Sequence, residues 1–185
     1  MSDFKRMLLE HQEVMQSLEP LLPQFEAAAA AVVDCLKSGG KIMLCGNGGS
    51  AADAQHIAAE IMGCFETERA ALPAIALTTD TSILTAVGND YGYESIFSRQ
   101  VQGLARSGDL LIGYSTSGNS RNVIKAVEQA KVLGCKVITL TGRDGGALSK
   151  LADVDLCVAS DSTARIQEAH AFLGHALCSA VDSAN

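Results

Sequence analysis

Apolar residues fall along this chain in two patterns, short unbroken runs and longer stretches in which they recur every three or four positions. The short runs are typical of strands buried on both faces, and they lie at 41–45, 73–77, 109–114, 136–140 and 154–158. The longer stretches predict helices that alternate with these strands: one from Ser50 onward, then 82–87, 96–104, 123–133 and 162–181. This alternation predicts a single α/β domain over residues 1–185, with a five-stranded parallel sheet in the flavodoxin-like order 2-1-3-4-5.

Two more helices are predicted ahead of the first strand. Residues 3–19 carry helical apolar spacing with Asp3 as the expected N-cap, and residues 23–38 form a second helix stopped by the glycines that follow. Residues 1–38 are therefore interpreted as a helical extension to the α/β core. Their apolar stripes either meet another subunit, which is our expectation, or pack on the sheet.

The stretch from Cys45 to Glu60 is the first candidate binding element. Gly46, Asn47, Gly48 and Gly49 follow the first strand, and Ser50 opens a helix. Glycines allow backbone N–H groups to approach an oxyanion, and the helix dipole adds positive potential there. The loop matches neither the dinucleotide nor the nucleoside triphosphate motif, so a smaller phosphate-bearing ligand fits better. A tight turn with nothing bound is an equal alternative for the loop alone, and His56 and Glu60 on the next turns of the helix favour the ligand.

A second polar loop follows the third predicted strand. It offers four hydroxyls around one glycine, from Ser115, Thr116, Ser117 and Ser120. Hydroxyls at a helix start bind phosphomonoesters, although Ser117 or Ser120 acting only as a helix cap is the competing interpretation. In the predicted strand order this loop and the glycine loop flank the topological switch point, which favours a ligand site. Asn89 and Asp90 lie in a predicted loop after the second strand, and a simple turn is the slightly preferred interpretation there.

Several polar residues of two helices complete the set of candidates. His56 and Glu60 are four positions apart and share one helix face. Gln167 and His175 lie on the last helix about 80° and ~12 Å apart, so they can border one pocket from different turns. His170 points about 140° away from His175, and each histidine taken alone is interpreted as structural.

Composition narrows the class of function. The net charge is −7, which leaves no basic stripe for nucleic acid, and no apolar run approaches the ~20 residues that span a bilayer. Six cysteines without Cys-x-x-Cys spacing are expected to be reduced and mostly buried. We therefore expect a soluble, cytoplasmic protein that binds neither nucleic acid nor membrane.

Three segments together resemble the sugar isomerase (SIS) family over nearly the whole chain, and they lie at 47–56, 115–120 and 164–170. The resemblance is strongest to the branch that isomerises sedoheptulose 7-phosphate. It implies an aldose–ketose isomerase that forms D-glycero-D-manno-heptose 7-phosphate, the first step of bacterial ADP-heptose and lipopolysaccharide-core heptose synthesis. It also implies a cytoplasmic homotetramer with active sites between subunits and one zinc ion per subunit.

The resemblance assigns roles to individual residues. Glu60 and His175 would be the catalytic acid/base pair, and the metal ligands would be His56, Glu60, Gln167 and His175. Substrate contacts would come from Asn47, Gly48, Gly49, Ser50, Glu60, Asn89, Asp90, Ser115, Thr116, Ser117, Ser120 and Gln167. The family commonly has Arg where this chain has Cys64, and Arg69 is a possible replacement for that cation.

A second function is also compatible with the sequence. Some SIS-domain proteins are non-catalytic regulators that bind a phosphosugar or a replication-initiation partner, and these lose part of the His/Glu set. Retention of His56, Glu60, Gln167 and His175 favours the enzyme.

Overall fold

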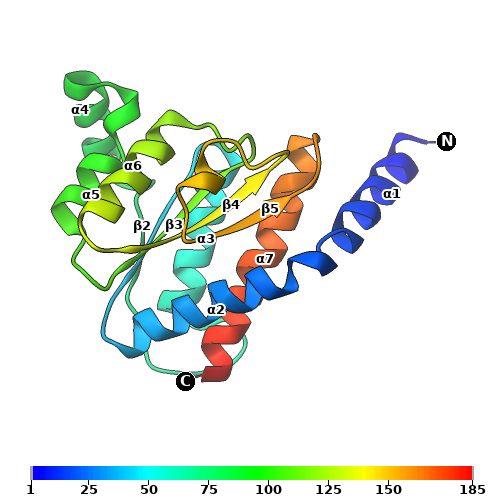
Figure 1. Ribbon diagram of the computed structural model, residues 1–185, viewed down its shortest axis with the longest axis horizontal. Helices are drawn as coiled ribbons and strands as arrows, with labels where there is room; N and C mark the ends of the chain where they lie inside the picture. Colours follow the sequence, from blue (N-terminus) through cyan, green and yellow to red (C-terminus); the bar gives the residue numbers. More distant parts are fainter. Residues whose placement is uncertain (1, 185) are drawn as a thin grey trace.

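The computed structural model describes residues 2–184. Five parallel strands form one sheet in the order β2-β1-β3-β4-β5 (Figure 1). Their bounds are β1 Ile42–Cys45, β2 Ala74–Ala76, β3 Leu110–Ser115, β4 Lys136–Gly142 and β5 Val154–Val158. The predicted flavodoxin-like α/β fold is therefore confirmed, with only short differences at the strand ends.

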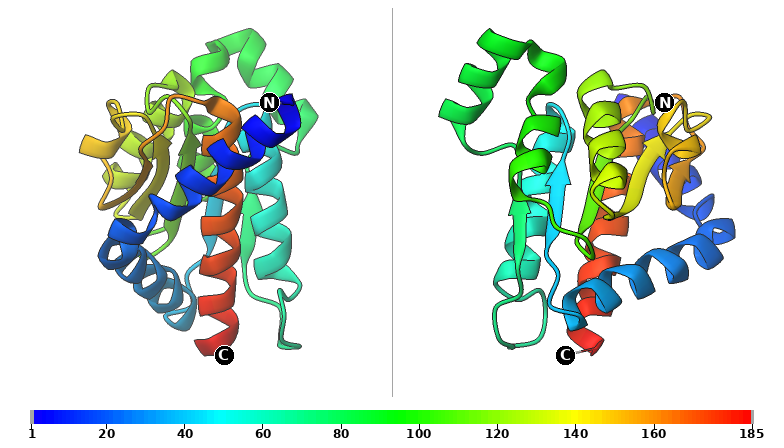
Figure 2. Two further views of the ribbon diagram at one scale, coloured as in Figure 1. Left: turned by 90° about the vertical axis from the view of Figure 1, so that its right-hand side faces the viewer. Right: turned by 60° about the vertical axis from the view of Figure 1, so that its left-hand side comes forward.

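Helices cover both faces of the sheet (Figure 2). On one face the core contains α2 (Leu22–Lys37), α3 (Gly49–Met62) and α7 (Thr163–Ala184). On the other face it contains α5 (Ser98–Leu104) and α6 (Arg121–Val132). Covering both faces explains why the strands carry unbroken apolar runs rather than an alternating pattern.

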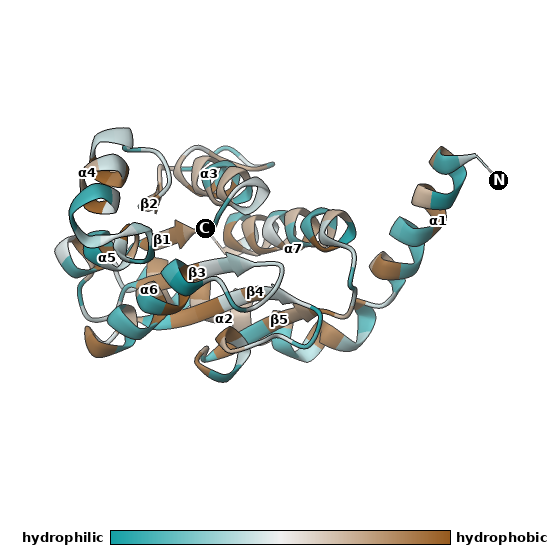
Figure 3. Cartoon of the chain, turned by 90° about the horizontal axis from the view of Figure 1, so that it is seen from above, coloured by the Kyte–Doolittle hydropathy of each residue, from teal (hydrophilic) through white to brown (hydrophobic). Residues whose placement is uncertain are grey.

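The pairing of β1 with β3 places the candidate loops. Every residue of both strands is buried, and β1 is drawn in the hydrophobic colour in Figure 3. The strands run parallel with Cys45 opposite Gly113, so their carboxyl ends lie at the same edge of the sheet. The glycine loop after β1 and the hydroxyl loop after β3 are consequently neighbours at the switch point.

The first helix is shorter than predicted. Helix α1 spans Asp3–Gln16, and a short 3₁₀ segment, η1 (Glu19–Leu21), separates it from α2. The proline at position 20 explains the early end, because its ring clashes with the carbonyl four residues before it, that of Gln16. The predicted Asp3 cap was wrong: Ser2 is the N-cap, and its hydroxyl accepts from the Lys5 N–H at 3.4 Å.

The two N-terminal helices differ in how they pack. Helix α2 contributes five buried residues to the core, so it packs as part of the α/β domain. Helix α1 buries none and extends away from the body beside the first half of α7 (Figure 1). It is held there by Arg165, which donates to the Met7 carbonyl at 2.6 Å, and by a contact of 2.8 Å between His11 Nδ1 and Glu168 Oε2.

The segment after β2 departs from the prediction. Helix α4 spans Thr81–Tyr91 with Asp80 as its N-cap, so Asn89 and Asp90 lie in its last turn and not in a loop. The sequence prediction stopped this helix at Gly88, but the glycine with positive φ is Gly92, at +83°. The helix therefore ends at the residue that adopts the left-handed conformation.

Two short 3₁₀ segments complete the fold, η2 (Tyr93–Ser95) and η3 (Leu148–Lys150). None of the helices within residues 2–184 is long and apolar enough to cross a membrane.

A buried ion pair ties the end of α3 to α7. The Arg69 Nε lies 2.7 Å from Asp182 Oδ1, and both side chains are about 5% exposed or less. Arg69 also donates to the carbonyls of Glu60 and Ile61, while the second Asp182 oxygen accepts from the N–H groups of Glu66 and Thr67. Burial alone would raise the pKa of Asp182, but these hydrogen bonds and the Arg69 charge outweigh it and lower that pKa to about 2.

We predict that Asp182→Ala lowers the unfolding free energy by roughly 3–5 kcal/mol, because it leaves the Arg69 charge buried without its partner. Urea unfolding checks this, with Glu10→Ala as the control, since Glu10 pairs with Arg6 on the exposed side of α1. The Asp182 pKa is depressed on folding, so its contribution is present above pH 4 and is lost as pH falls towards 2. Equal losses in the two variants would contradict the account.

Candidate functional site

The glycine loop packs directly against α7. Gly48 has a φ of +57° and occupies the N-cap position of α3, which has no side-chain cap. A Cβ on Gly49 would collide with the side-chain amide of Gln167, so this amide lies on the loop backbone. The structure thus brings together Gly48, Gly49 and Gln167, three of the predicted substrate contacts, while Ser50 is buried at the start of the helix.

The hydroxyl loop gathers three serine side chains. Ser115 Oγ lies 2.8 Å from Ser120 Oγ and 3.5 Å from Ser117 Oγ. Ser120 occupies the N-cap position of α6 but makes no capping hydrogen bond. Its hydroxyl turns toward Ser115 instead, so the capping interpretation does not describe Ser120. Thr116 is half-buried in the same loop.

The hydroxyl loop rests on the segment after β4. Gly118 has a φ of +65°, and a Cβ there would collide with the carbonyl oxygen of Gly145. The Leu148 N–H donates to the Gly118 carbonyl at 3.0 Å, and the Ala147 N–H donates to Asn119 Oδ1 at 3.1 Å. Close backbone contact therefore fixes the position of the hydroxyl loop against this segment.

His56 and His175 meet across α3 and α7. Their Nε2 atoms lie 2.7 Å apart, and the His175 ring stacks on Phe65. Glu60 Oε1 lies 3.6 Å from His56 Nδ1, on the other side of that ring. Among the described residues, no three His, Cys, Asp or Glu side chains form a group that could hold a metal ion. Three of the four predicted ligands, His56, Glu60 and His175, are thus brought into one region, while the amide of Gln167 lies against Gly49.

Asp53 is a further titratable group of α3 that the sequence reasoning did not single out. It lies three positions before His56 and is half-buried. Burial raises its pKa to about 6, partly opposed by the His56 charge. Its Oδ2 atom is buried and makes no hydrogen bond with any residue from 2 to 184.

His170 has the structural role expected of it. Its side chain is fully buried, and Nε2 bonds the Thr141 carbonyl at 2.9 Å. Burial lowers its pKa to about 4, against the opposing effect of that hydrogen bond. The ring is therefore neutral at physiological pH.

Asn89 and Asp90 are not brought to the loops by any contact between described side chains. The Asn89 amide donates to Asp90 at 2.8 Å, and both residues are exposed on α4.

The suggestion that Arg69 replaces the family's usual cation is wrong, because its guanidinium is buried against Asp182 and backbone carbonyls. Cys64 lies near Glu68, with 3.9 Å between Sγ and Oε2.

Two residues beside the glycine loop were missed by the sequence reasoning. Asn122 exchanges two side-chain hydrogen bonds with Asn47, and the Tyr93 hydroxyl donates to Asn47 Oδ1. The Asn47–Asn122 pair is separated by 75 residues, so no local pattern reveals it. The only signal was the position of Asn122 directly after the hydroxyl loop.

Comparison with known proteins identifies the family. Residues 9–142 match the model of the SIS domain. The chain is 57% identical to the phosphoheptose isomerase of Aliarcobacter butzleri over 176 residues, covering 95% of this chain and 93% of that protein. The solved structure of phosphoheptose isomerase from Neisseria gonorrhoeae is 50% identical, with a TM-score of 0.92 and 97% coverage of both chains. The solved structure of a phosphoheptose isomerase from Francisella tularensis is 42% identical, with a TM-score of 0.90, and the match covers 99% of this chain and 100% of the other. The chain therefore belongs to the SIS-domain family and, within it, to the phosphoheptose isomerases.

Proposed function

We propose that this protein is an aldose–ketose isomerase that converts sedoheptulose 7-phosphate to D-glycero-D-manno-heptose 7-phosphate. The observation that carries this is the 57% identity to a phosphoheptose isomerase over nearly the full chain. The convergence of the glycine loop, the hydroxyl loop and the His56–Glu60–His175 region supports it. A non-catalytic regulator is not favoured, since relatives of this identity are named as isomerases.

The chemistry divides between the two ends of the substrate. The hydroxyls of Ser115, Thr116, Ser117 and Ser120 hold the phosphate at the start of α6, where the helix dipole also favours negative charge. Isomerisation removes a proton from C1 of the ketose, forms an enediol and returns a proton to C2. Glu60 is the carboxylate placed to carry that proton, because it lies three turns along the helix that begins at the glycine loop, and its side chain leans back toward that loop.

His175 completes the acid/base pair. Its Nε2 lies 2.7 Å from His56 Nε2. The imidazole serves either as the acid that moves the oxygen-bound proton of the enediol between O1 and O2 or, as a metal ligand, in polarising the carbonyl. Stacking on Phe65 fixes the ring plane. Asn89 and Asp90 stay proposed substrate contacts on the strength of the family resemblance alone.

Zinc is proposed as the bound metal. Two Nε2 atoms directed at each other suit nitrogen ligands of zinc, and the Glu60 carboxylate and Gln167 amide oxygen would complete the set. A bound zinc would polarise the substrate carbonyl. The present Glu60 conformation faces His56 Nδ1, so its side chain would turn to join the two imidazole nitrogens.

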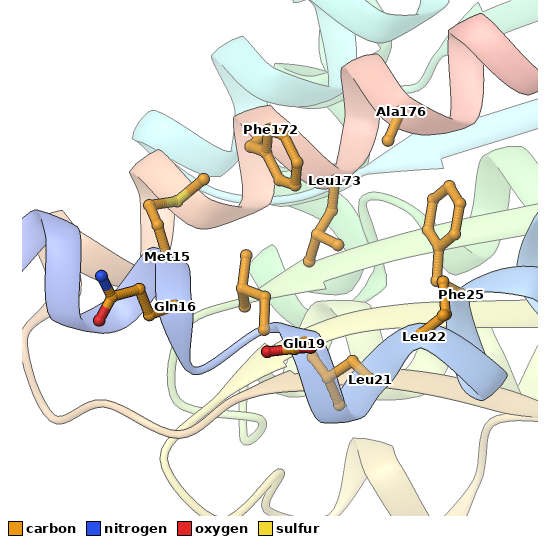
Figure 4. A pocket seen from close by; sticks show the side chains of 10 residues that line it. Met15, Gln16, Glu19, Leu21, Leu22, Phe25, Phe172, Leu173 and Ala176 are labelled. Carbon is orange, nitrogen blue, oxygen red and sulfur yellow. The ribbon is translucent and has the colours of Figure 1, made fainter.

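A homotetramer in the cytoplasm is proposed for the assembled protein. Helices α1, α2 and α7 frame an apolar groove of about 440 Å³ (Figure 4), lined in part by Leu22 and Phe172, which are 56% and 50% exposed. Helix α1 carries further exposed apolar residues, Phe4, Met7, Leu8 and Leu9. Such a face is typical of contacts between subunits.

All six cysteines are free thiols, which suits a reducing compartment.

The substrate assignment predicts that purified protein converts sedoheptulose 7-phosphate to the aldose, measured by chromatography of the product. In Thr116→Ala/Ser120→Ala, KM should rise at least about 10-fold, because two hydrogen bonds to a charged phosphate are lost. The matched control is Ser98→Ala, at the start of α5, whose hydroxyl donates to the Ser95 carbonyl. An unchanged KM in the double variant would remove this loop from the site.

The base assignment predicts that Glu60→Gln lowers kcat by roughly 10²–10⁴ or more, while the shape of the side chain is kept. Glu128→Gln, on the exposed side of α6, is the control. Elemental analysis of the same samples, purified without chelator, should find zinc in the wild type and also in Glu60→Gln, where the three other proposed ligands, His56, Gln167 and His175, remain. If zinc and activity disappear together in Glu60→Gln, the residue is a ligand and not the base. Wild-type protein that is free of zinc and insensitive to chelator would contradict the metal proposal.

The assembly prediction is a tetramer by light scattering at micromolar concentration. Phe172→Asp places a charge in the apolar groove and should lower the measured mass, whereas Val132→Asp, on α6 and 80% exposed, should not. A stable wild-type monomer would overturn the proposal.

A further inference from the structure

The side chain of Asn47 is almost fully occupied by its neighbours. Asn47 Nδ2 donates to Asn122 Oδ1 at 2.9 Å, and Asn122 Nδ2 donates back to Asn47 Oδ1 at 2.8 Å. The Tyr93 hydroxyl donates to the same Asn47 oxygen at 3.1 Å. A carboxamide has two N–H groups and two acceptor positions, so Asn47 keeps one N–H for a substrate.

This network joins three segments that border the candidate site. Asn47 belongs to the glycine loop, Asn122 is the second residue of α6 after the hydroxyl loop, and Tyr93 belongs to η2. Asn122 is 4% exposed, and its Oδ1 also accepts the Val123 N–H at 3.0 Å, which fixes the amide to the helix start. Flipping either amide would place two N–H donors, or two carbonyl oxygens, opposite each other. The pair therefore specifies the orientation of both side chains.

Tyr93 approaches the loop from the other side. Together with Asn47 and Gly48 it lines a small cavity of about 130 Å³ beside the start of α3. The neighbouring Glu94 pairs with Arg121 and Lys125 of α6, at 2.9 and 3.0 Å. Those pairs join η2 to α6 and are weak because they are exposed, whereas the Tyr93 hydroxyl reaches a residue of the glycine loop itself.

We propose that Asn122 and Tyr93 are positioning residues for the isomerase reaction, which hold Asn47 so that the glycine loop and the hydroxyl loop keep the spacing that the substrate requires. Asn47 then acts chiefly as a hydrogen-bonded link between the loops, and its one remaining N–H contacts the sugar. The kinetic part of this inference rests on the proposed function. Loss of the hydrogen bonds of Asn47 lets the loops move apart, and the rate of catalysis depends steeply on such small displacements.

The test compares Tyr93→Phe, which removes one hydroxyl, with Tyr91→Phe, an equal change on α4 where the hydroxyl makes no hydrogen bond with a described residue. For Tyr93→Phe, kcat/KM should fall about 3–10-fold, mainly through kcat, and the melting temperature should stay unchanged because residue 93 is 64% exposed. Tyr91→Phe should match wild type. Equal kinetics in the two variants would overturn the role of Tyr93.

A double-mutant cycle tests Asn122. Asn122→Ala should lower kcat by about 10–100-fold, and Asn47→Ala should lower it at least as much. The double variant should be no worse than Asn47→Ala, since Asn122 acts only through Asn47. Losses that multiply would show independent roles and defeat the inference.

If wild type does not turn over sedoheptulose 7-phosphate, the proposed function fails by itself. The Asn47–Asn122 contact is then tested by the exchange rate of the Asn122 side-chain amide protons, which Asn47→Ala should increase. A rate that Asn47→Ala leaves unchanged would show that the pair is absent.

Discussion

The parallel pairing of β1 with β3 is the constraint on which the site depends. These two strands are separated by more than sixty residues of chain, yet Cys45 lies opposite Gly113 and every residue of both is buried. Ile42 and Leu44 of β1 pack in the core with α2, α3 and α7, whereas Met43 and Cys45 pack on the face of α5 and α6. A one-residue shift would exchange these two sets between the faces, so packing on both faces fixes the register. The same register sets the glycine loop beside the hydroxyl loop, so the stability of the core and the geometry of the site have one origin.

Helix α7 is the second element that fold and site share. Its buried face packs on α2 and α3, and its carboxyl end holds Arg69 through Asp182. Near its amino end it presents Gln167 to Gly49, and in its middle it presents His175 to His56. Arg69 in turn bonds the carbonyls at the end of α3, close to Glu60. The proposed base is therefore held by an ion pair that takes no part in the chemistry.

Periodicity was sufficient to predict the sheet, its strand order and the two polar loops at the switch point, because apolar runs and glycines report burial and turns locally. It failed where the decisive contact was distant or where several residues competed to end a helix. Gly88 looked like a helix stop, but α4 continues to Gly92, which alone in that segment adopts positive φ. Arg69 looked like a free cation until its buried partner, 113 residues away, was visible. The Asn47–Asn122 pair has the same character, since a reciprocal amide contact leaves no periodic signal.

The central claim is that one substrate spans the two loops, with its phosphate on the hydroxyl loop and its carbonyl end at Glu60. A crystal structure of the Glu60→Gln protein with bound sedoheptulose 7-phosphate tests this most directly. The account predicts phosphate oxygens within hydrogen-bond distance of Ser115, Thr116 and Ser120, and C1 and C2 of the sugar next to residue 60 and His175. A phosphate bound at the glycine loop instead, or a sugar that lies away from α3, would contradict it.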